Sequence, residues 1–378
     1  MSGPRGTLAR VSEPVHHLTR EQARRLAVRA QLLDAARPGD VVEAAEQLGA
    51  IKIDPTATIA PSEQTILFSR IGWGYEPGQL TAAVERDRLL FEYDGHFRPV
   101  TLLPAHLARM RGRVFRAQAT QWLEANARFR ADVLARLRAE GPMLAAQIPD
   151  TSQVAHRNEA GWYGSNQVPR MLELLSYVGE AAIVGREGRQ RVWDLGERVY
   201  ADVPVLGYDD AGAVLEEHRL QAAGIARQKS PWTPVGTAGA LASVEGSAWR
   251  WRVDAAALDT LDDDPGGRVA ILNPYDGMLF DRPRLKELFG FEFVLEQFKP
   301  KAQRRFGYFV HPILVGDRFA ALLDAELDKK KENLVVTAVH ELDPVDDVLR
   351  LDDEEREMVD AEISDLAEWL GVPVVRAR

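Results

Sequence analysis

The chain contains no cysteine, and this absence removes several classes of chemistry at once. Disulfide bonds, thiolate zinc sites and cysteine-ligated iron–sulfur clusters all require that residue. The eight histidines show neither an HExxH pattern nor another metal-binding spacing, so we expect no metal site and no cofactor. No apolar run approaches the roughly 20 residues of a membrane helix, and the N-terminus lacks an apolar signal segment. These absences predict a cytoplasmic protein that binds no membrane.

Lysine is also scarce, because the chain has eight lysines against 39 arginines. The net charge of −10 argues at first against a nucleic-acid partner, but the acidic residues are unevenly distributed. Residues 341–368 hold thirteen acidic residues and two arginines, so the rest of the chain is close to neutral and has room for basic faces. The arginine excess fits either a GC-rich genome, which composition alone favours, or bidentate contacts with phosphates.

A chain of 378 residues is too long for one compact core, so we expect several domains. Helical patterns dominate and short strands occur between them, which predicts a mainly helical α+β fold. Turn signals and composition divide the chain into a flexible arm, three winged-helix-like units, a small β-domain and an acidic C-terminal helix. The expected boundaries are 1–17, 18–140, 141–205, 206–261, 268–340 and 341–378.

Local signals predict several elements directly. Thr19 and Gln22 have the spacing of a capping box at a helix start, and Gly49 has the position of a helix-ending glycine. The acidic C-terminal helix should pack through its apolar residues, which are Leu349, Leu351, Met358, Ile363, Leu366 and Trp369. The strands expected in the β-domain are Val269–Leu272, Phe291–Phe298, Gly307–Leu314, Arg318–Leu323 and Leu334–Ala338.

A short apolar strand, Ile51–Asp54, carries the candidate reaction centre. Lys52 and Asp54 stand two residues apart, and such side chains leave the same face of a strand about 6–7 Å from each other. A cation and a carboxylate held in this way between isoleucines are a possible reaction centre.

Arginines occur at positions that suit contacts with DNA phosphates. A helix–helix–hairpin order over 141–205 is typical of a winged helix, in which a recognition helix enters a groove and the wing touches the backbone. The wing arginines are Arg186, Arg189 and Arg191, and Arg170 lies on the expected recognition helix. A second set, expected on one helix face, comprises Arg109, Arg113 and Arg116. A solvated surface is the alternative for this second set.

Two long stretches resemble the YcaQ/AlkZ-type DNA glycosylases. The first reads LGAIKID…LFSRIG…LLFEYDGH…LLP (Leu48–Pro104), and the second joins ILNPYDGMLFDRPRLKELFGFEF to KPKAQRRFGYFVHPILVGDRF (Ile271–Phe319). The sequences GWYG at Gly161–Gly164 and REGRQRVWDL at Arg186–Leu195 also match the family pattern. The resemblance implies tandem winged helices in a C-shaped arrangement with a β-domain. It also implies excision of bulky N7-alkylated purines from duplex DNA, and crosslink repair in some members.

The resemblance also identifies candidate catalytic residues. The family has Gln-x-Gln or Gln-x-Asp on the strand after the second helix, and the matching residues here are Lys52 and Asp54. Lys52 replaces the glutamine, so three interpretations stay open: an ion pair with Asp54, contact with a phosphate or neutral lesion, or an amine nucleophile that forms a Schiff base. His96 matches a histidine that the family usually has, either structural or a contact to the lesion or sugar, and Glu92 is placed to hold it.

The β-domain adds two further features. Lys299, Lys301, Arg304 and Arg305 form a basic cluster that either clamps the opposite DNA strand or is a solvated edge. Asn273–Asp276 is interpreted as a turn that packs the β-domain, with a role in the site as the alternative. The resulting prediction is a monomeric, nucleoid-associated DNA repair glycosylase. The alternative is a winged-helix DNA- or lesion-binding protein without excision activity, because Lys-x-Asp replaces the family motif.

Overall fold

The computed structural model describes residues 13–155, 166–342 and 350–377. The predicted motif at Gly161–Gly164, the packing residue Leu349 and residues 1–12 lie outside this range. The helices are α1 (Arg20–Ala30), α2 (Val41–Leu48), α3 (Ser62–Ile71), α4 (Pro77–Thr81), α5 (Leu103–Arg111), α6 (Ala117–Ala125), α7 (Ala127–Glu140), α8 (Val168–Tyr177), α9 (Gly196–Val199), α10 (Tyr208–Ala223), α11 (Arg282–Phe289) and α12 (Asp353–Trp369).

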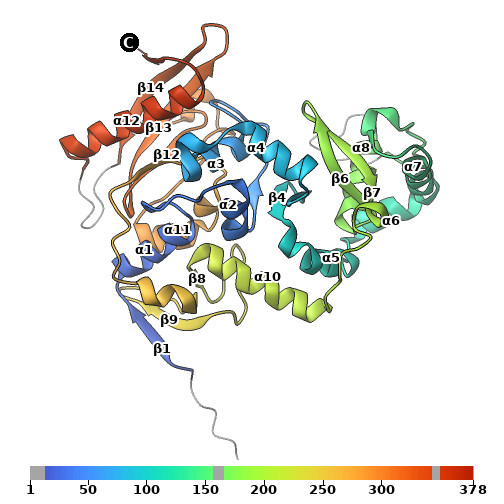
Figure 1. Cartoon of the computed structure of the whole chain (residues 1–378), viewed down its shortest axis with the longest axis horizontal. Helices are drawn as coiled ribbons and strands as arrows, with labels where there is room; N and C mark the ends of the chain where they lie inside the picture. The colour runs from blue at the N-terminus through green and yellow to red at the C-terminus, as the bar shows by residue number, and fades with distance from the viewer. Residues whose placement is uncertain (1–12, 156–165, 343–349, 378) are drawn as a thin grey trace, which may run out of the picture.

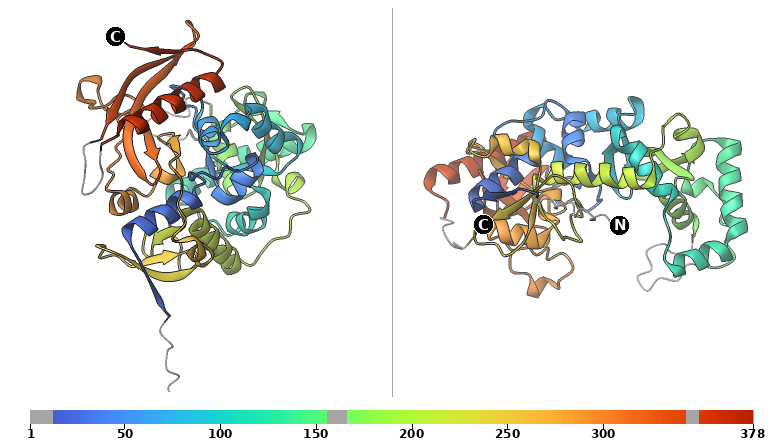
Figure 2. Two further views of the ribbon diagram at one scale, coloured as in Figure 1. Left: turned by 60° about the vertical axis from the view of Figure 1, so that its left-hand side comes forward. Right: turned by 90° about the horizontal axis from the view of Figure 1, so that it is seen from below.

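The elements gather into a larger and a smaller lobe (Figure 1). The larger lobe contains α1–α3, α11 and α12 together with the strands of the C-terminal half. The smaller lobe contains α6, α7 and α8 beside the hairpin of β6 (Ala181–Glu187) and β7 (Gln190–Leu195). Helix α10 extends from the larger lobe toward the smaller one, as the view from below also shows (Figure 2). The fold is therefore mixed α+β, as the sequence predicts.

One six-stranded sheet connects the two lobes, with the strand order β2-β4-β3-β6-β7-β5. Its remaining strands are β2 (Ile51–Lys52), β3 (Leu90–Tyr93), β4 (His96–Pro99) and β5 (Met143–Leu144). Strand β3 meets β6 where Glu92 pairs with Ile183, so the expected first and second units share this sheet. Glu92 thus lies at the junction between the lobes.

The predicted helix ends of the first unit are confirmed. Thr19 caps α1, and its side chain accepts a hydrogen bond from the backbone N–H of Gln22. The side chain of Gln22 in turn accepts a hydrogen bond from the backbone N–H of Thr19. Asp40 caps α2 by accepting hydrogen bonds from the N–H groups of Val42 and Glu43, and α2 ends at Gly49, which has a φ of 67°. Glycine tolerates this left-handed conformation without the steric cost of a Cβ atom.

The arginine-rich region does not form the expected single helix face. Helix α5 ends at Arg111, and the chain then turns before α6 starts at Ala117. Arg113 and Arg116 lie in this connection, so they share no helix face with Arg109. Gly112 caps the end of α5, and an added Cβ atom at this position would meet the ring of Tyr208 at 2.4 Å. The prediction of a straight arginine stripe is wrong because helix packing at this glycine ends the helix early.

A four-stranded sheet with the order β1-β9-β10-β8 covers the end of α1. Its strands are β1 (Val15–Leu18), β8 (Ile225–Arg227), β9 (Ala240–Val244) and β10 (Trp251–Val253). Strand β1 pairs in parallel with β9. Residues 15–17, which the sequence assigns to a flexible arm, therefore belong to a sheet, because β9 satisfies their backbone hydrogen bonds. The two partners lie more than 200 residues apart, which no local pattern reveals.

The β-domain is a five-stranded sheet with the order β11-β12-β13-β14-β15. Its strands are β11 (Val269–Ile271), β12 (His311–Val315), β13 (Arg318–Asp328), β14 (Asn333–Glu341) and β15 (Val374–Arg376). Four of the five predicted strands are confirmed in part or in full. The fifth prediction, Phe291–Phe298, is wrong, because this segment is irregular and buries Phe291 in a stack on Phe319 at 4.3 Å. Burial against the sheet, and not strand pairing, explains its aromatic residues.

The acidic C-terminal segment folds as predicted where the structure describes it. Helix α12 begins with a capping box at Asp352 and buries Leu351, Ile363 and Leu366 against the larger lobe. Trp369 stacks on Phe68 with 4.7 Å between the ring centroids. Most acidic residues of α12 lie on its solvent face, whereas Glu362 is buried.

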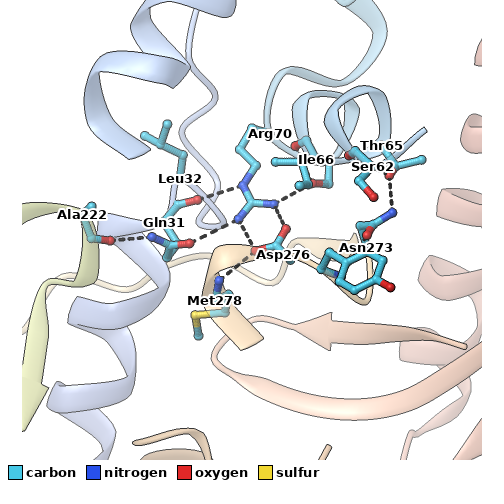
Figure 3. Close-up of polar contacts among 12 residues, drawn as sticks. Gln31, Leu32, Ser62, Thr65, Ile66, Arg70, Ala222, Asn273, Asp276 and Met278 are labelled. Carbon is cyan, nitrogen blue, oxygen red and sulfur yellow. Dashed lines mark hydrogen bonds and ion pairs between the residues drawn. The ribbon is translucent and has the colours of Figure 1, made fainter. Parts of the chain in front are cut away.

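A buried ion pair connects the β-domain to helix α3 (Figure 3). Arg70 donates to both carboxylate oxygens of Asp276, and their side chains are 1% and 0% exposed. The Nε atom of Arg70 also donates to the carbonyl of Gln31 at 3.1 Å, and Asn273 donates to Thr65 at 2.9 Å. The Asn273–Asp276 turn thus packs the β-domain, as the sequence predicts.

Candidate active site

The candidate carboxylate Asp54 follows the end of strand β2. The strand stops at Lys52, and the N–H of Ile53 then donates to the carbonyl of Gly95 at 2.9 Å. One carboxylate oxygen of Asp54 accepts a hydrogen bond from the N–H of Thr56 at 2.8 Å. No ion pair with Asp54 is found among the described residues. Asp54 therefore presents a carboxylate that is held in place but is not neutralised by a cation.

Asp54 lines a cleft of about 700 Å³ between the start of α3 and the β6–β7 hairpin. The Ile53, Phe97 and Ile183 side chains provide an apolar wall. The charged residues of the cleft are Asp54, Glu63, Glu85, Glu92, Glu173, Arg186, Arg189 and Arg191. The cleft thus brings the candidate carboxylate and the three predicted wing arginines together. This volume is large enough for a nucleobase with its sugar, because ligand pockets span roughly 300–1,000 Å³.

Lys52 does not line this cleft. Its Nζ atom donates to the carbonyl of Ile53 at 2.9 Å and to the carbonyl of Gly95 at 3.3 Å. Within the described part of the chain, no carboxylate oxygen lies within 4.0 Å of Nζ. The interpretation that pairs Lys52 with Asp54 is therefore wrong. The expected common face is lost because β2 ends at Lys52, so the alternation of a strand does not continue to Asp54.

Glu92 is bound by two of the wing arginines. Its carboxylate forms ion pairs with Arg186 at 2.8 Å and with Arg191 at 2.7 Å, and the Glu92 side chain is 1% exposed. The expectation that Glu92 holds His96 is wrong, because His96 donates instead from Nδ1 to the carbonyl of Asp94 at 2.7 Å. Glu92 fixes the hairpin relative to β3, and its two arginines leave Arg189 as the exposed cation of the wing.

His96 is held in its neutral form. Burial, together with the nearby charges of Arg98 and Lys52, lowers the pKa of His96 to about 4. Because Phe97 lines the cleft and strand side chains alternate, His96 points to the opposite side of β4. The structure therefore places His96 beside Lys52 and not beside Asp54.

Glu63 lines the cleft without a signal in the sequence, whereas Tyr275 belongs to the Asn273–Asp276 turn, for which a role in the site is the alternative interpretation. The acidic Glu63 in the first turn of α3 has the pattern of an ordinary helix-dipole partner. Tyr275 approaches from the β-domain, where burial is the main cause that raises its pKa and the charge of Asp54 contributes. The side chain of Gln297 donates to the hydroxyl of Tyr275. Both residues reach Asp54 only because the chain brings α3 and the β-domain together.

Glu63 has an unusual environment for a carboxylate. Its Oε2 atom is buried and has no hydrogen-bond partner. Burial raises the pKa of Glu63, while backbone N–H groups and the charge of Arg186 partly oppose this effect. The folded protein therefore binds a proton at Glu63 more tightly than the unfolded chain does.

Replacing Glu63 by glutamine should stabilise the protein at neutral pH. The raised pKa of Glu63 means that its contribution to stability is complete below the ordinary value of 4.5 and is lost as pH rises. Glu63→Gln removes this loss, so its advantage in urea unfolding should be present at pH 7.5 and vanish at pH 4. Glu354→Gln, in the first turn of α12, is the matched control and should be neutral or slightly destabilising. An unchanged or lower midpoint for Glu63→Gln at pH 7.5 would contradict the assignment.

The other predicted basic residues lie away from this cleft. Arg109 stacks on Tyr208 at 4.0 Å, and Arg113 stacks on Tyr177 at 4.3 Å. In the β-domain, Lys299 pairs with Glu296 at 2.8 Å. The remaining basic residues that the sequence predicts to contact DNA do not line the cleft either. They are Arg116, Arg170, Lys301, Arg304 and Arg305. Packing thus separates residues that the sequence places in similar patterns.

Comparison with known proteins identifies the family. The family model described as "DNA glycosylase AlkZ-like" matches residues 45–369, which is most of the chain. The chain belongs to the AlkZ-like DNA glycosylase family. The matched region of this AlkZ-like protein contains the cleft, the β6–β7 hairpin and strands β11–β14 of the β-domain.

The fold of this AlkZ-like chain is similar to that of a solved relative. The DNA glycosylase AlkZ of Streptomyces sahachiroi aligns with a TM-score of 0.64 at 15% sequence identity. The alignment covers 96% of this chain and 100% of the AlkZ chain. In the described part of the AlkZ-like protein, no helix has the length and apolar character needed to cross a membrane. The same residues contain no group of three or more potential metal ligands.

Proposed function

We propose that this protein is a DNA glycosylase that hydrolyses the N-glycosidic bond of bulky N7-alkylated purines in duplex DNA. The observation that carries the proposal is Asp54, a carboxylate that forms no ion pair with a described residue and lines a nucleotide-sized cleft. The sequence resemblance places the same residue in the family motif. An N7-alkylated purine is cationic and leaves without protonation. The enzyme must then stabilise an oxocarbenium-like sugar and position a water, and a carboxylate can do both.

The replacement of glutamine by Lys52 is compatible with this chemistry in the observed geometry. A cation about 4 Å from a cationic base would repel it by about 4 kcal/mol at an effective dielectric of 20. Lys52 avoids this penalty because its Nζ atom binds two backbone carbonyls outside the cleft. The role of the missing glutamine in orienting water then falls to other groups, and Tyr275 is the nearest candidate from the β-domain.

The same proposal includes the mode of DNA binding. Winged-helix units in a C-shaped arrangement would hold the duplex, with the β6–β7 hairpin as the wing and α8 as the recognition helix. We propose that a single copy of the chain acts on chromosomal DNA, and hence in the bacterial nucleoid. The alternative function, lesion binding without excision, stays open because Lys52 cannot accept a hydrogen bond from water.

Incision of DNA that contains N7-methylguanine tests the activity. Purified protein should convert the lesion to an abasic site, which alkali then cleaves to a shorter strand on a gel. A hydrolytic mechanism produces no covalent adduct, whereas a Schiff base at Lys52 would be trapped by borohydride. Tight binding to the lesion without any abasic product would instead support the binding protein.

DNA binding should depend on salt and on Arg189. Because phosphate contacts release counterions, affinity for undamaged duplex should fall steeply between 50 and 200 mM salt. Arg189→Ala should weaken binding about equally for all sequences and reduce the log–log salt slope by about 1. Arg136→Ala is the matched control, since Arg136 lies on α7 and pairs with Glu140 away from the cleft. Fluorescence anisotropy measures both slopes, and equal slopes for Arg189→Ala and native protein would argue against the wing contact.

A further inference from the structure

A second polar site lies on the side of β4 that faces away from the cleft. Lys52 of β2 pairs directly with His96 of β4, and directly paired residues of neighbouring strands share one face of the sheet. Arg98 follows His96 by two positions, so it also lies on this face, while Phe97 between them lines the cleft. Lys52, His96 and Arg98 therefore share one face of the sheet.

Helix α5 covers this face and adds His106. The ring of His106 lies 5.5 Å from the ring of Tyr93 and 5.7 Å from that of Phe91. These two residues of β3 pair with His96 and Arg98, respectively. The histidine is thus placed over the same face as the three basic residues.

Helix α10 closes the site from a third side. It runs beside α5 and also meets α2 (Figure 1). It contributes His218, whose Nε2 atom donates to the carbonyl of Glu46 at 2.7 Å, and Arg219. The charge of Arg219 helps to lower the pKa values of both Arg98 and His106. We give the name basic chamber to five side chains that β2, β4, α5 and α10 contribute, namely Lys52, His96, Arg98, His106 and Arg219.

Arg98 lacks a partner in the basic chamber. Its Nε atom is buried and makes no hydrogen bond, and its guanidinium forms no ion pair with a described residue. The Nε2 atom of His106 is buried and unpartnered as well. Buried polar groups are normally hydrogen-bonded, and a buried charge without a partner is strongly unfavourable. Both groups therefore indicate a ligand that accepts hydrogen bonds and carries negative charge.

The nearby acidic residues do not satisfy this demand. The exposed Asp94 raises the pKa of Arg98, but burial outweighs it and lowers that pKa to about 10. Glu46 accepts a hydrogen bond from Thr101 at 2.6 Å. The charge of Glu216 opposes the effect of burial, which lowers the pKa of Arg219. Burial and the surrounding cations lower the pKa of His106 to about 3, so this histidine is neutral. The basic chamber thus combines fixed cations with neutral donors.

We propose that the basic chamber binds a phosphate group. Arg98 and Lys52 supply the positive charge, and His106 supplies a neutral donor. A guanidinium suits the oxygens of a phosphate because its N–H groups form a planar fork. The phosphate group comes either from the DNA backbone or from free inorganic phosphate. For the DNA source the inference rests on the proposed function, because the phosphodiester would belong to the duplex on which the proposed glycosylase acts.

Thermal unfolding with inorganic phosphate tests the site without any DNA. Native protein should gain several degrees in unfolding midpoint at millimolar phosphate, relative to chloride at equal ionic strength, because a ligand that binds only the folded state stabilises it. Arg98→Met should lose this gain and, since it removes an unpaired buried cation, should unfold at a higher midpoint than native protein in chloride. General effects of phosphate on protein hydration act on both proteins and cancel in the comparison.

Two more variants keep the thermal test decisive. Lys52→Gln changes a partly exposed side chain and should reduce the phosphate response even if Arg98→Met fails to fold. Arg136→Met, on α7, is the control and should keep the full response. An undiminished response in both Arg98→Met and Lys52→Gln would overturn the proposal.

Binding to undamaged duplex separates the two sources of phosphate. If the ligand is a DNA phosphodiester, Arg98→Met should reduce the log–log salt slope by about 1, and 10 mM phosphate should compete with DNA for native protein only. If the ligand is free phosphate, the thermal response is lost while the salt slope stays unchanged. A phosphate response that survives in a protein without excision activity would count against the proposed function and not against the basic chamber.

Discussion

Asp54→Asn is expected to lower the rate of excision by about a hundred- to a thousandfold. The substitution keeps the shape of the side chain but removes the charge that stabilises the oxocarbenium-like sugar, and such electrostatic terms are worth about 3–4 kcal/mol. The hydrogen bond from the N–H of Thr56 can still be accepted by the amide oxygen, so the local fold should persist. Single-turnover kinetics on N7-methylguanine DNA measure the effect.

The expected loss concerns the chemical step and not DNA binding. Affinity for the lesion should change little, because the negative charge of Asp54 contributes no attraction to the DNA phosphates. Asp87→Asn is a suitable control, since Asp87 lies on the surface, pairs with Arg86 and does not line the cleft. A folded Asp54→Asn protein that excises at the native rate would show that the reaction centre lies elsewhere.

Asp276→Asn is expected to destabilise the protein by about 3–5 kcal/mol. The substitution leaves the guanidinium of Arg70 buried without a counter-charge, and removal of one partner of a buried pair is strongly unfavourable. Arg70→Met should have a similar effect, because it leaves the Asp276 carboxylate buried. The double variant Arg70→Met/Asp276→Leu should recover much of the loss, since it buries no charge. Urea unfolding of native protein, Arg70→Met, Asp276→Leu and the double variant gives the coupling energy.

An exposed ion pair provides the comparison for this result. Arg376 and Asp360 are 53% and 59% exposed, so Asp360→Asn should cost less than about 1 kcal/mol. Because the Arg70–Asp276 pair connects α3 to the β-domain, its loss should also loosen the approach of Tyr275 to Asp54. Equal stability of the Asp276 and Asp360 variants would show that the buried pair does not hold this interface.

Elements defined by local signals were predictable from the sequence. The capping box of Thr19 and the glycine at position 49 depend on hydrogen bonds and backbone angles within a few residues. The amphipathic pattern of α12 likewise identified its buried face. The strand prediction for Phe291–Phe298 was wrong because aromatic residues suit both a strand and an irregular segment that packs on a sheet.

The sequence by itself placed Asp54 and the wing arginines in one family pattern, because that pattern is a set of short motifs. Only the tertiary structure decided which groups these residues meet. Glu92 binds Arg186 and Arg191, which lie 94 and 99 residues away. Lys52 turns to backbone carbonyls because β2 ends after two residues. Charge partners and desolvation depend on the environment from all sides, and residues distant in the chain supply that environment.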